Sequence, residues 1–351
     1  MHPSISNATA VALLLIAAAG AQTPHTLPAD LADAGTPVLI PRTGGAGATV
    51  FGEGVTADWQ GNVYFGEQDQ SNKTMQLKAG QDTAKFWRQA ADNPNGMWLD
   101  YSQNRIVICQ QHALVRVKAG AAFDNQTDTL YKNTGQDLND VTGDSKGNLF
   151  FTNYMGSTLF FRNAATGETK AVFTDIKRPN GVEWDEERKR LYLHEFGANK
   201  VHLYDVAEDY SLSNKRDFDS VTSCDGITLD EKGNVYSVSY TTGIVHVRDP
   251  DAKKLGQISI TGQQMTNLAF GGADFKTLYL ITIKGLYKLP MKVKGYKSGK
   301  PLVSIAPAFS RDVGVEASSA LFKLDGRRVA PNDRQGKEYA VPLFLAPVVG
   351  H

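Results

Sequence analysis

Residues 61–65 read GNVYF, and this pattern of a turn followed by a short apolar stretch occurs five more times. The other copies are NRIVIC at 104–109, GNLFFT at 147–152, KRLYLH at 189–194, GNVYSV at 233–238 and KTLYLIT at 276–282. Their first apolar residues are spaced 43, 43, 42, 44 and 43 residues apart along the chain. A fixed period of this size indicates a repeat architecture in which each repeat is one supersecondary unit.

Each repeat contains further strand-like segments on both sides of this stretch. Upstream lies an alternating apolar and polar segment, of the kind EGVTADW, that ends in a turn. Downstream lie a third series and a more irregular fourth, whose weakest member is near Asp217 and whose last is PLVSI at 301–305. No helical period interrupts them. The pattern predicts an all-β fold, a six-bladed β-propeller with four-stranded antiparallel blades around a central channel.

The segments outside the repeats suggest how the rest of the chain is organised. An apolar run from Ala10 to Ala19 and the small residues Ala19-Gly20-Ala21 have the pattern of a secretory signal peptide and its cleavage site, although no Lys or Arg precedes them. Export would make the protein periplasmic or secreted. We expect a signal peptide at 1–21, an N-terminal segment at 22–49 whose VLIP at 38–41 could close the ring, the propeller at 50–306, and an extension without an assigned position at 307–351.

Composition excludes several classes of partner. The 351 residues include 37 Lys+Arg and 37 Asp+Glu, which gives a formal net charge of +0. Without a basic cluster the sequence does not indicate nucleic-acid binding, or membrane binding after signal cleavage. The two cysteines, Cys109 and Cys224, fall in non-neighbouring repeats, so we expect two buried free thiols and no disulfide. The sequence does not indicate an oligomeric state.

A polar residue precedes the Gly, Asp or Asn that opens each upstream segment. The innermost strands of a propeller line its channel, so equivalent residues of the six blades should form one ring around the axis. Carboxylate and amide oxygens suit Ca²⁺, although another divalent cation remains possible, and Zn²⁺ is disfavoured because no His or Cys is present. The alternative is that these are ordinary turn residues. The six positions are Glu53, Asn95, Asn139, Asn180, Asp225 and Thr266.

The repeats together resemble the SMP-30/gluconolactonase/LRE-like family over roughly residues 50–290. The resemblance rests on EGVTADWQGNVYF, PNGMWLDYSQNRIVICQQH, LNDVTGDSKGNLFFTN, RPNGVEWDEERKRLYLHE, CDGITLDEKGNVYSV and TNLAFGGADFKTLYLIT, in this order. It implies a catalytic divalent cation, usually Ca²⁺, and hydrolysis of a sugar-acid lactone as the small-molecule substrate. Related propellers hydrolyse organophosphates. The metal ligands implied by the resemblance are Glu53, Asn139, Asn180 and Asp225.

The resemblance also implies roles around the metal. Asp225 is the candidate general base or, in a variant mechanism, the nucleophile. Asn95 would line the same channel and is a candidate substrate-binding residue. His112 and Tyr154 fall after strand ends and are further candidates for substrate binding, or could be polar residues satisfied by their neighbours. CQQH at 109–112 and TNYMG at 152–156 depart from family habit near the expected pocket mouth, so the substrate stays open. His194 and Glu195 follow a strand end and could reach the pocket, or could be polar residues satisfied by their neighbours.

Two other functions are compatible with the sequence. A propeller can bind a ligand or a protein without catalysis, because fold does not fix function. An esterase or organophosphate hydrolase could use the same site. Glu53 and Asp225 on one ring favour an enzyme, because a scaffold has no need for two channel carboxylates.

Overall fold

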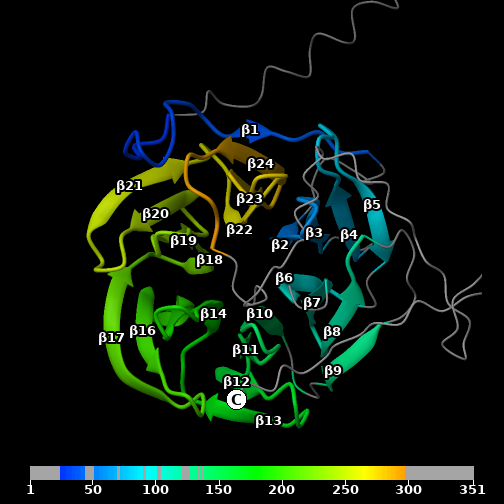
Figure 1. The fold of residues 1–351 in the computed structure, drawn as a ribbon, viewed down its shortest axis with the longest axis vertical. Helices are drawn as coiled ribbons and strands as arrows, with labels where there is room; N and C mark the ends of the chain where they lie inside the picture. The colour runs from blue at the N-terminus through cyan, green and yellow to red at the C-terminus, as the bar shows by residue number, and fades with distance from the viewer. Residues whose placement is uncertain are drawn as a thin grey trace, which may run out of the picture. The chain divides into compact units, whose positions relative to one another are not determined.

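The computed structural model describes residues 24–43, 51–68, 72–89, 92–100, 104–120, 127–132, 135 and 137–296. These residues form six four-stranded antiparallel sheets that follow one another around a central axis (Figure 1). The six-bladed propeller predicted from the repeat is therefore confirmed. The expected signal peptide and the extension at 307–351 lie outside the described residues. Within the described part of the chain, no helix has the length and apolar character needed to cross a membrane.

Blades one to five are each built from four consecutive strands, innermost first. Blade one contains β2 (Gly52–Ala57), β3 (Val63–Glu67), β4 (Lys73–Leu77) and β5 (Lys85–Gln89). Blade two contains β6 (Pro94–Asp100), β7 (Arg105–Gln110), β8 (Ala113–Lys118) and β9 (Asp128–Lys132). Blade three contains β10 (Leu138–Gly143), β11 (Leu149–Asn153), β12 (Thr158–Arg162) and β13 (Thr169–Phe173).

The remaining blades follow the same order. Blade four contains β14 (Pro179–Asp185), β15 (Arg190–Glu195), β16 (Lys200–Val206) and β17 (Leu212–Ser220), with a short 3₁₀ turn at Phe196–Ala198. Blade five contains β18 (Cys224–Leu229), β19 (Val235–Ser239), β20 (Ile244–Arg248) and β21 (Lys254–Ser259). Blade six contains β22 (Met265–Gly271), β23 (Thr277–Thr282) and β24 (Gly285–Pro290).

The fourth strand of blade six comes from the other end of the propeller. β1 (Val38–Leu39) pairs antiparallel with β24, with Val38 opposite Lys288. A strand was expected at 38–41, and it occupies the position that the sequence pattern gave to PLVSI. Residues 301–305 themselves lie outside the described residues. The strand near Asp217, expected to be weak, is the nine-residue β17 because its long pairing with β16 supports it.

A buried aspartate fixes the turn between the first and second strands of several blades. In blade one, the Asp58 carboxylate accepts hydrogen bonds from the backbone of Gln60 and Asn62, from the Asn62 amide and from the Tyr64 hydroxyl. Gly61 has φ +80°, a conformation that glycine adopts without steric cost. Blades three and five repeat the arrangement around Asp144 and Asp230. The Gly-Asn pairs of the repeat are therefore part of a tight turn.

The apolar residues of the repeat form the core between blades. Trp98 and Trp184, on the first strands β6 and β14, are buried in this core. Trp59 differs: it lies in the turn after β2 and is 37% exposed. Cys109 and Cys224 are both buried free thiols, which confirms the expectation.

Candidate active site

The first strand of every blade contains a register shift where the axial polar residue lies. In blade one the shift falls between Glu53 and Val55, and in blade four between Pro179 and Val182. The other four first strands have the same irregularity. A bulge bends a strand and re-aims a side chain. In blades one to five it therefore turns the residue before the Gly or Asp toward the axis.

Glycines next to the axial residues allow the blades to approach closely. A Cβ atom on Gly54 would collide with the backbone carbonyl oxygen of Asn95 in the next blade. A Cβ atom on Gly181 would collide in the same way with the carbonyl oxygen of Asp225. In each of these polar-Gly pairs, the polar residue supplies a side chain to the channel. The glycine that follows has no Cβ atom, which the close approach of the next blade requires.

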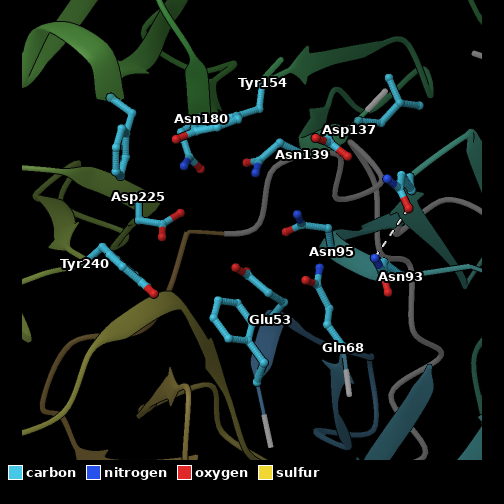
Figure 2. Close-up of a pocket in the computed structure, with 14 residues that line it drawn as sticks. Glu53, Gln68, Asn93, Asn95, Asp137, Asn139, Tyr154, Asn180, Asp225 and Tyr240 are labelled. Atoms are coloured by element: carbon cyan, nitrogen blue, oxygen red, sulfur yellow. Dashed lines mark hydrogen bonds between the residues drawn. The ribbon is translucent and has the colours of Figure 1, made fainter. Parts of the chain in front are cut away.

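Five of the six ring residues line one cavity of about 350 Å³ at an end of the channel. Their side chains converge from the first strands of blades one to five (Figure 2). Thr266 does not join them. It is fully buried, and its hydroxyl donates a 2.8 Å hydrogen bond to the carbonyl oxygen of Gly52, so it ties blade six to blade one. The five are Glu53, Asn95, Asn139, Asn180 and Asp225.

Glu53 and Asp225 are two buried carboxylates in the same small volume, each 7% exposed. Burial raises the pKa of Glu53 to about 8, and the charge of Asp140 adds to the rise. The pKa of Asp225 is raised well above its usual range by burial and then by the charge of Glu53, while a hydrogen bond from Asn180 opposes the shift. Both acids would be ionised more easily beside a cation.

The donor set fits a hard cation. Two carboxylates with two or three amide oxygens match the ligands that Ca²⁺ takes, and their buried charges would be compensated by it. The described residues contain no group of three or more His, Cys, Asp or Glu arranged to hold a metal ion. A cation here would therefore depend on the amide oxygens of Asn139 and Asn180 as well as on the two acids.

A second layer of side chains holds the backbone of the site. His194 is fully buried, and its Nδ1–H donates a 2.6 Å hydrogen bond to the carbonyl oxygen of Asp225, while Nε2 accepts one from Ser237 at 3.1 Å. Burial lowers the pKa of His194 to about 4, so the ring is neutral. Thr152 Oγ1 donates to the carbonyl oxygen of Asn180 at 2.9 Å. His194 thus lies behind the pocket wall, satisfied by its neighbours.

Of the other predicted site residues, one lines the cavity and two lie outside its lining. Tyr154 lines the cavity and packs edge-on against Phe196. His112 is exposed, pairs with Asp92 and does not line the cavity. Glu195 accepts a 2.7 Å hydrogen bond from His202 and is also outside the lining.

Several lining residues were missed by the sequence analysis. They lie just before or at the start of a first strand, or just after a second strand, where the repeat loses its regular spacing. The only signal in the sequence that could have indicated these residues is their number of positions from the ring residues along the chain. They are Phe51, Gln68, Asn93, Gln111, Asp137, Leu138, Phe196 and Tyr240.

A serine nucleophile is not part of the cavity lining. GDSKG at 143–147 has the G-x-S-x-G spacing of serine hydrolases. That pattern requires a strand-to-helix turn, whereas Ser145 lies in the turn between β10 and β11 and donates to Glu186 at 2.6 Å.

Fold and site together define a six-bladed β-propeller with a carboxylate-and-amide pocket on its axis. The family described as the SMP-30/Gluconolactonase/LRE-like region matches residues 51–284. The chain belongs to this family.

Individual relatives are more distant. A pentonolactonase, XacC, of Haloferax volcanii is 30% identical over 156 residues, which is 42% of this chain and 54% of the relative. The chain thus spans about half the length of that curated relative. The solved gluconolactonase of Xanthomonas campestris has a TM-score of 0.59 at 22% identity, covering 77% of this chain and 98% of its own. The calcium-binding protein regucalcin of Agrobacterium tumefaciens has a TM-score of 0.61 at 16% identity, covering 79% and 96%. At these identities the two structures show a shared fold.

Proposed function

We propose that the protein is a hydrolase that opens a sugar-acid lactone at the axial pocket. The observation that carries this proposal is the pair of buried carboxylates, Glu53 and Asp225, facing one another among neutral amides. Membership of the family, and relatives named pentonolactonase and gluconolactonase, support the same reaction class. Glu53, Asn139, Asn180 and Asp225 would hold a Ca²⁺ ion.

When bound, Ca²⁺ would supply a positive charge next to the lactone carbonyl oxygen, where negative charge develops during attack. The chain itself supplies the proton transfers. Asp225 accepts a proton from a water molecule whose oxygen bonds to the carbonyl carbon. The bond between that carbon and the ring oxygen then breaks, and the proton passes to the ring oxygen. The product is the open-chain hydroxy acid.

Asp225 is held for this role from two sides. Asn180 hydrogen-bonds its carboxylate, and His194 hydrogen-bonds its backbone carbonyl. Asn95 and Tyr154 would contact the substrate, because both line the cavity. His112 would need to move to do so, since it is turned toward Asp92.

A panel of aldonolactones, assayed with chelator and after Ca²⁺ add-back, tests the proposal. We expect hydrolysis above the spontaneous rate, loss on chelation and recovery on add-back. Turnover of aryl esters or organophosphates in place of lactones would favour the esterase alternative. Absence of any turnover, with a saturable small ligand or protein partner, would favour a binding propeller.

We further propose that the protein is exported to the periplasm or the medium. The apolar run before Gln22 supports this. Sequencing of the purified native protein should give an N-terminus at or near Gln22, whereas an intact Met1 on protein from the cytosol would contradict export.

A further inference from the structure

Among the described residues, the lining of the axial cavity includes no Lys, Arg or His. It contains three carboxylates, Glu53, Asp137 and Asp225, beside amide and aromatic side chains. The described lining therefore offers no positive charge to a bound ligand.

The wall beside Asp137 is neutral and braced. The Asn93 amide donates to the Gln111 side-chain oxygen at 3.4 Å, and the Gln68 amide donates to the carbonyl oxygen of Pro94 at 3.0 Å. Amides offer donors and acceptors without charge, which suits hydroxyl groups. Arg178 contacts the site from outside the lining, where its guanidinium lies 5.7 Å from the ring centre of Tyr154.

Asp137 is held rigidly at the edge of this wall. Its φ is +60°, a left-handed conformation that Asp and Asn tolerate better than most residues. Its carbonyl oxygen accepts a 2.9 Å hydrogen bond from the backbone of Tyr154. None of the described residues donates a hydrogen bond to its carboxylate, which lies on the cavity side near Asn139 (Figure 2). A partly buried acid in this position is available to a ligand.

We propose that Asp137 is a specificity-determining residue that binds hydroxyl groups of a neutral polyhydroxylated lactone and excludes anionic ones. This rests on the proposed function, in which Ca²⁺ compensates Glu53 and Asp225 and leaves Asp137 as the uncompensated charge. A carboxylate accepts hydrogen bonds from substrate hydroxyls. It repels a phosphate or sulfonate group in the same cavity, because like charges there are poorly screened.

The test compares glucono-lactone with its 6-phosphate, each corrected for spontaneous hydrolysis. Wild type should prefer the neutral lactone in kcat/KM by about tenfold or more, and the preference should shrink in high salt. Asp137→Asn keeps the shape of the side chain and the tolerance of positive φ but removes the charge. It should therefore reduce the ratio of kcat/KM for the neutral lactone to that for the 6-phosphate severalfold. Asp209→Asn is the matched control, an exposed carboxylate outside the lining, and should leave the ratio unchanged.

Calorimetry with sorbitol and sorbitol 6-phosphate on the Ca²⁺-loaded full chain gives the same comparison without turnover. If no lactone is hydrolysed, the proposed function fails. The affinities for sorbitol and sorbitol 6-phosphate then test by themselves whether the cavity prefers a neutral ligand to an anionic one. Preference for the neutral polyol that narrows in Asp137→Asn supports the inference. Equal use or binding of the two ligands by wild type would overturn it, as would a ratio that Asp137→Asn leaves unchanged.

Discussion

At the scale of single residues, Asp225 combines two demands. Its carboxylate is a candidate cation ligand, and it is also the proposed general base for the attacking water. Asn180 and His194 orient it through its side chain and its backbone, respectively. A ligand role and a base role respond differently to added Ca²⁺, and this difference separates them.

Asp225→Asn should lower kcat by about 10²–10⁴-fold even when Ca²⁺ is saturating, because a general base contributes that much. The amide keeps an oxygen donor but cannot accept the proton. Steady-state kinetics with metal content measured on the same sample checks this. Asn95→Ala, which removes a lining amide without an acid, should have a smaller effect. Restoration of the Asp225→Asn rate by excess Ca²⁺ would reduce Asp225 to a ligand.

Glu183 is an acid further along the channel whose charge should reduce stability. It accepts a 3.3 Å hydrogen bond from Thr142, and burial, aided by the charge of Asp140, raises its pKa to about 8. The folded state thus keeps a proton that the unfolded state loses near pH 4.5, so stability falls as pH rises between these values. Glu183→Gln should therefore be more stable than wild type at pH 9, on the order of 1–3 kcal/mol, and nearly equal at pH 5.

Denaturation in urea at both pH values, with Ca²⁺ held constant, measures that difference. A Glu183→Gln variant that is less stable than wild type at pH 9 would contradict the prediction. It would mean that the ionised Glu183 carboxylate is stabilised in the folded state.

At the scale of strands, the period of the sequence predicted the six blades but not how the site is formed. Six copies of an alternating apolar pattern determine the number of blades, because each copy is one hairpin-based sheet. The ring of axial residues was also visible, since each precedes a Gly, Asp or Asn. The register shifts could not be seen in the sequence, because a bulge adds one residue to a strand without requiring a particular residue type.

The exceptions have local physical causes. Thr266 has the expected position but is buried by a hydrogen bond to Gly52 that only the closed ring provides. Asp137 and Gln111 line the cavity from segments beside the strands, where no periodicity applies. Distances between such segments depend on blade packing, which the sequence pattern does not contain.

The strand that closes blade six should be a stability determinant. Ile40, directly after β1, is 5% exposed, and its backbone N–H donates to the carbonyl oxygen of Leu286. Ile40→Ala should lower the free energy of unfolding by about 2–5 kcal/mol, the usual range for a buried aliphatic truncation. Val38→Ala is the control, because Val38 is 54% exposed and should change stability by about 0.5 kcal/mol or less. Equal losses in the two variants, measured by chemical denaturation, would mean that this segment does not hold the ring.

At the scale of the whole molecule, the proposed cation would join four blades. Glu53, Asn139, Asn180 and Asp225 come from blades one, three, four and five. A ligand that binds only the folded state stabilises it, by about 2.7 kcal/mol at 100 times its Kd. For a chain of this size that is roughly 3–5 °C in Tm.

The stabilisation by Ca²⁺ should increase with pH. Without the cation the pKa of Glu53 is raised to about 8, so below that pH protons compete with Ca²⁺ for the site. The metal-free protein should itself lose stability as pH rises from about 4.5 toward 8, because the unfolded chain releases a proton that the buried Glu53 keeps. Calorimetric scans with Ca²⁺ and with chelator should therefore differ more at pH 8.5 than at pH 6. A shift in Tm that is the same at both values would place the bound cation elsewhere.

The pairing of β1 with β24 also affects how the chain reaches its closed form during synthesis. The ribosome makes β1 first among the described strands and its partner last. Until β24 has emerged, a nascent chain has an unpaired edge at both ends of the ring, and edges of this kind invite pairing with other chains. A product truncated before Gly285 lacks β24 and cannot complete the sixth blade. Pairing of β1 with β24 therefore distinguishes complete chains from truncated ones. Only a complete propeller has both strand edges paired and inaccessible to chaperones and proteases.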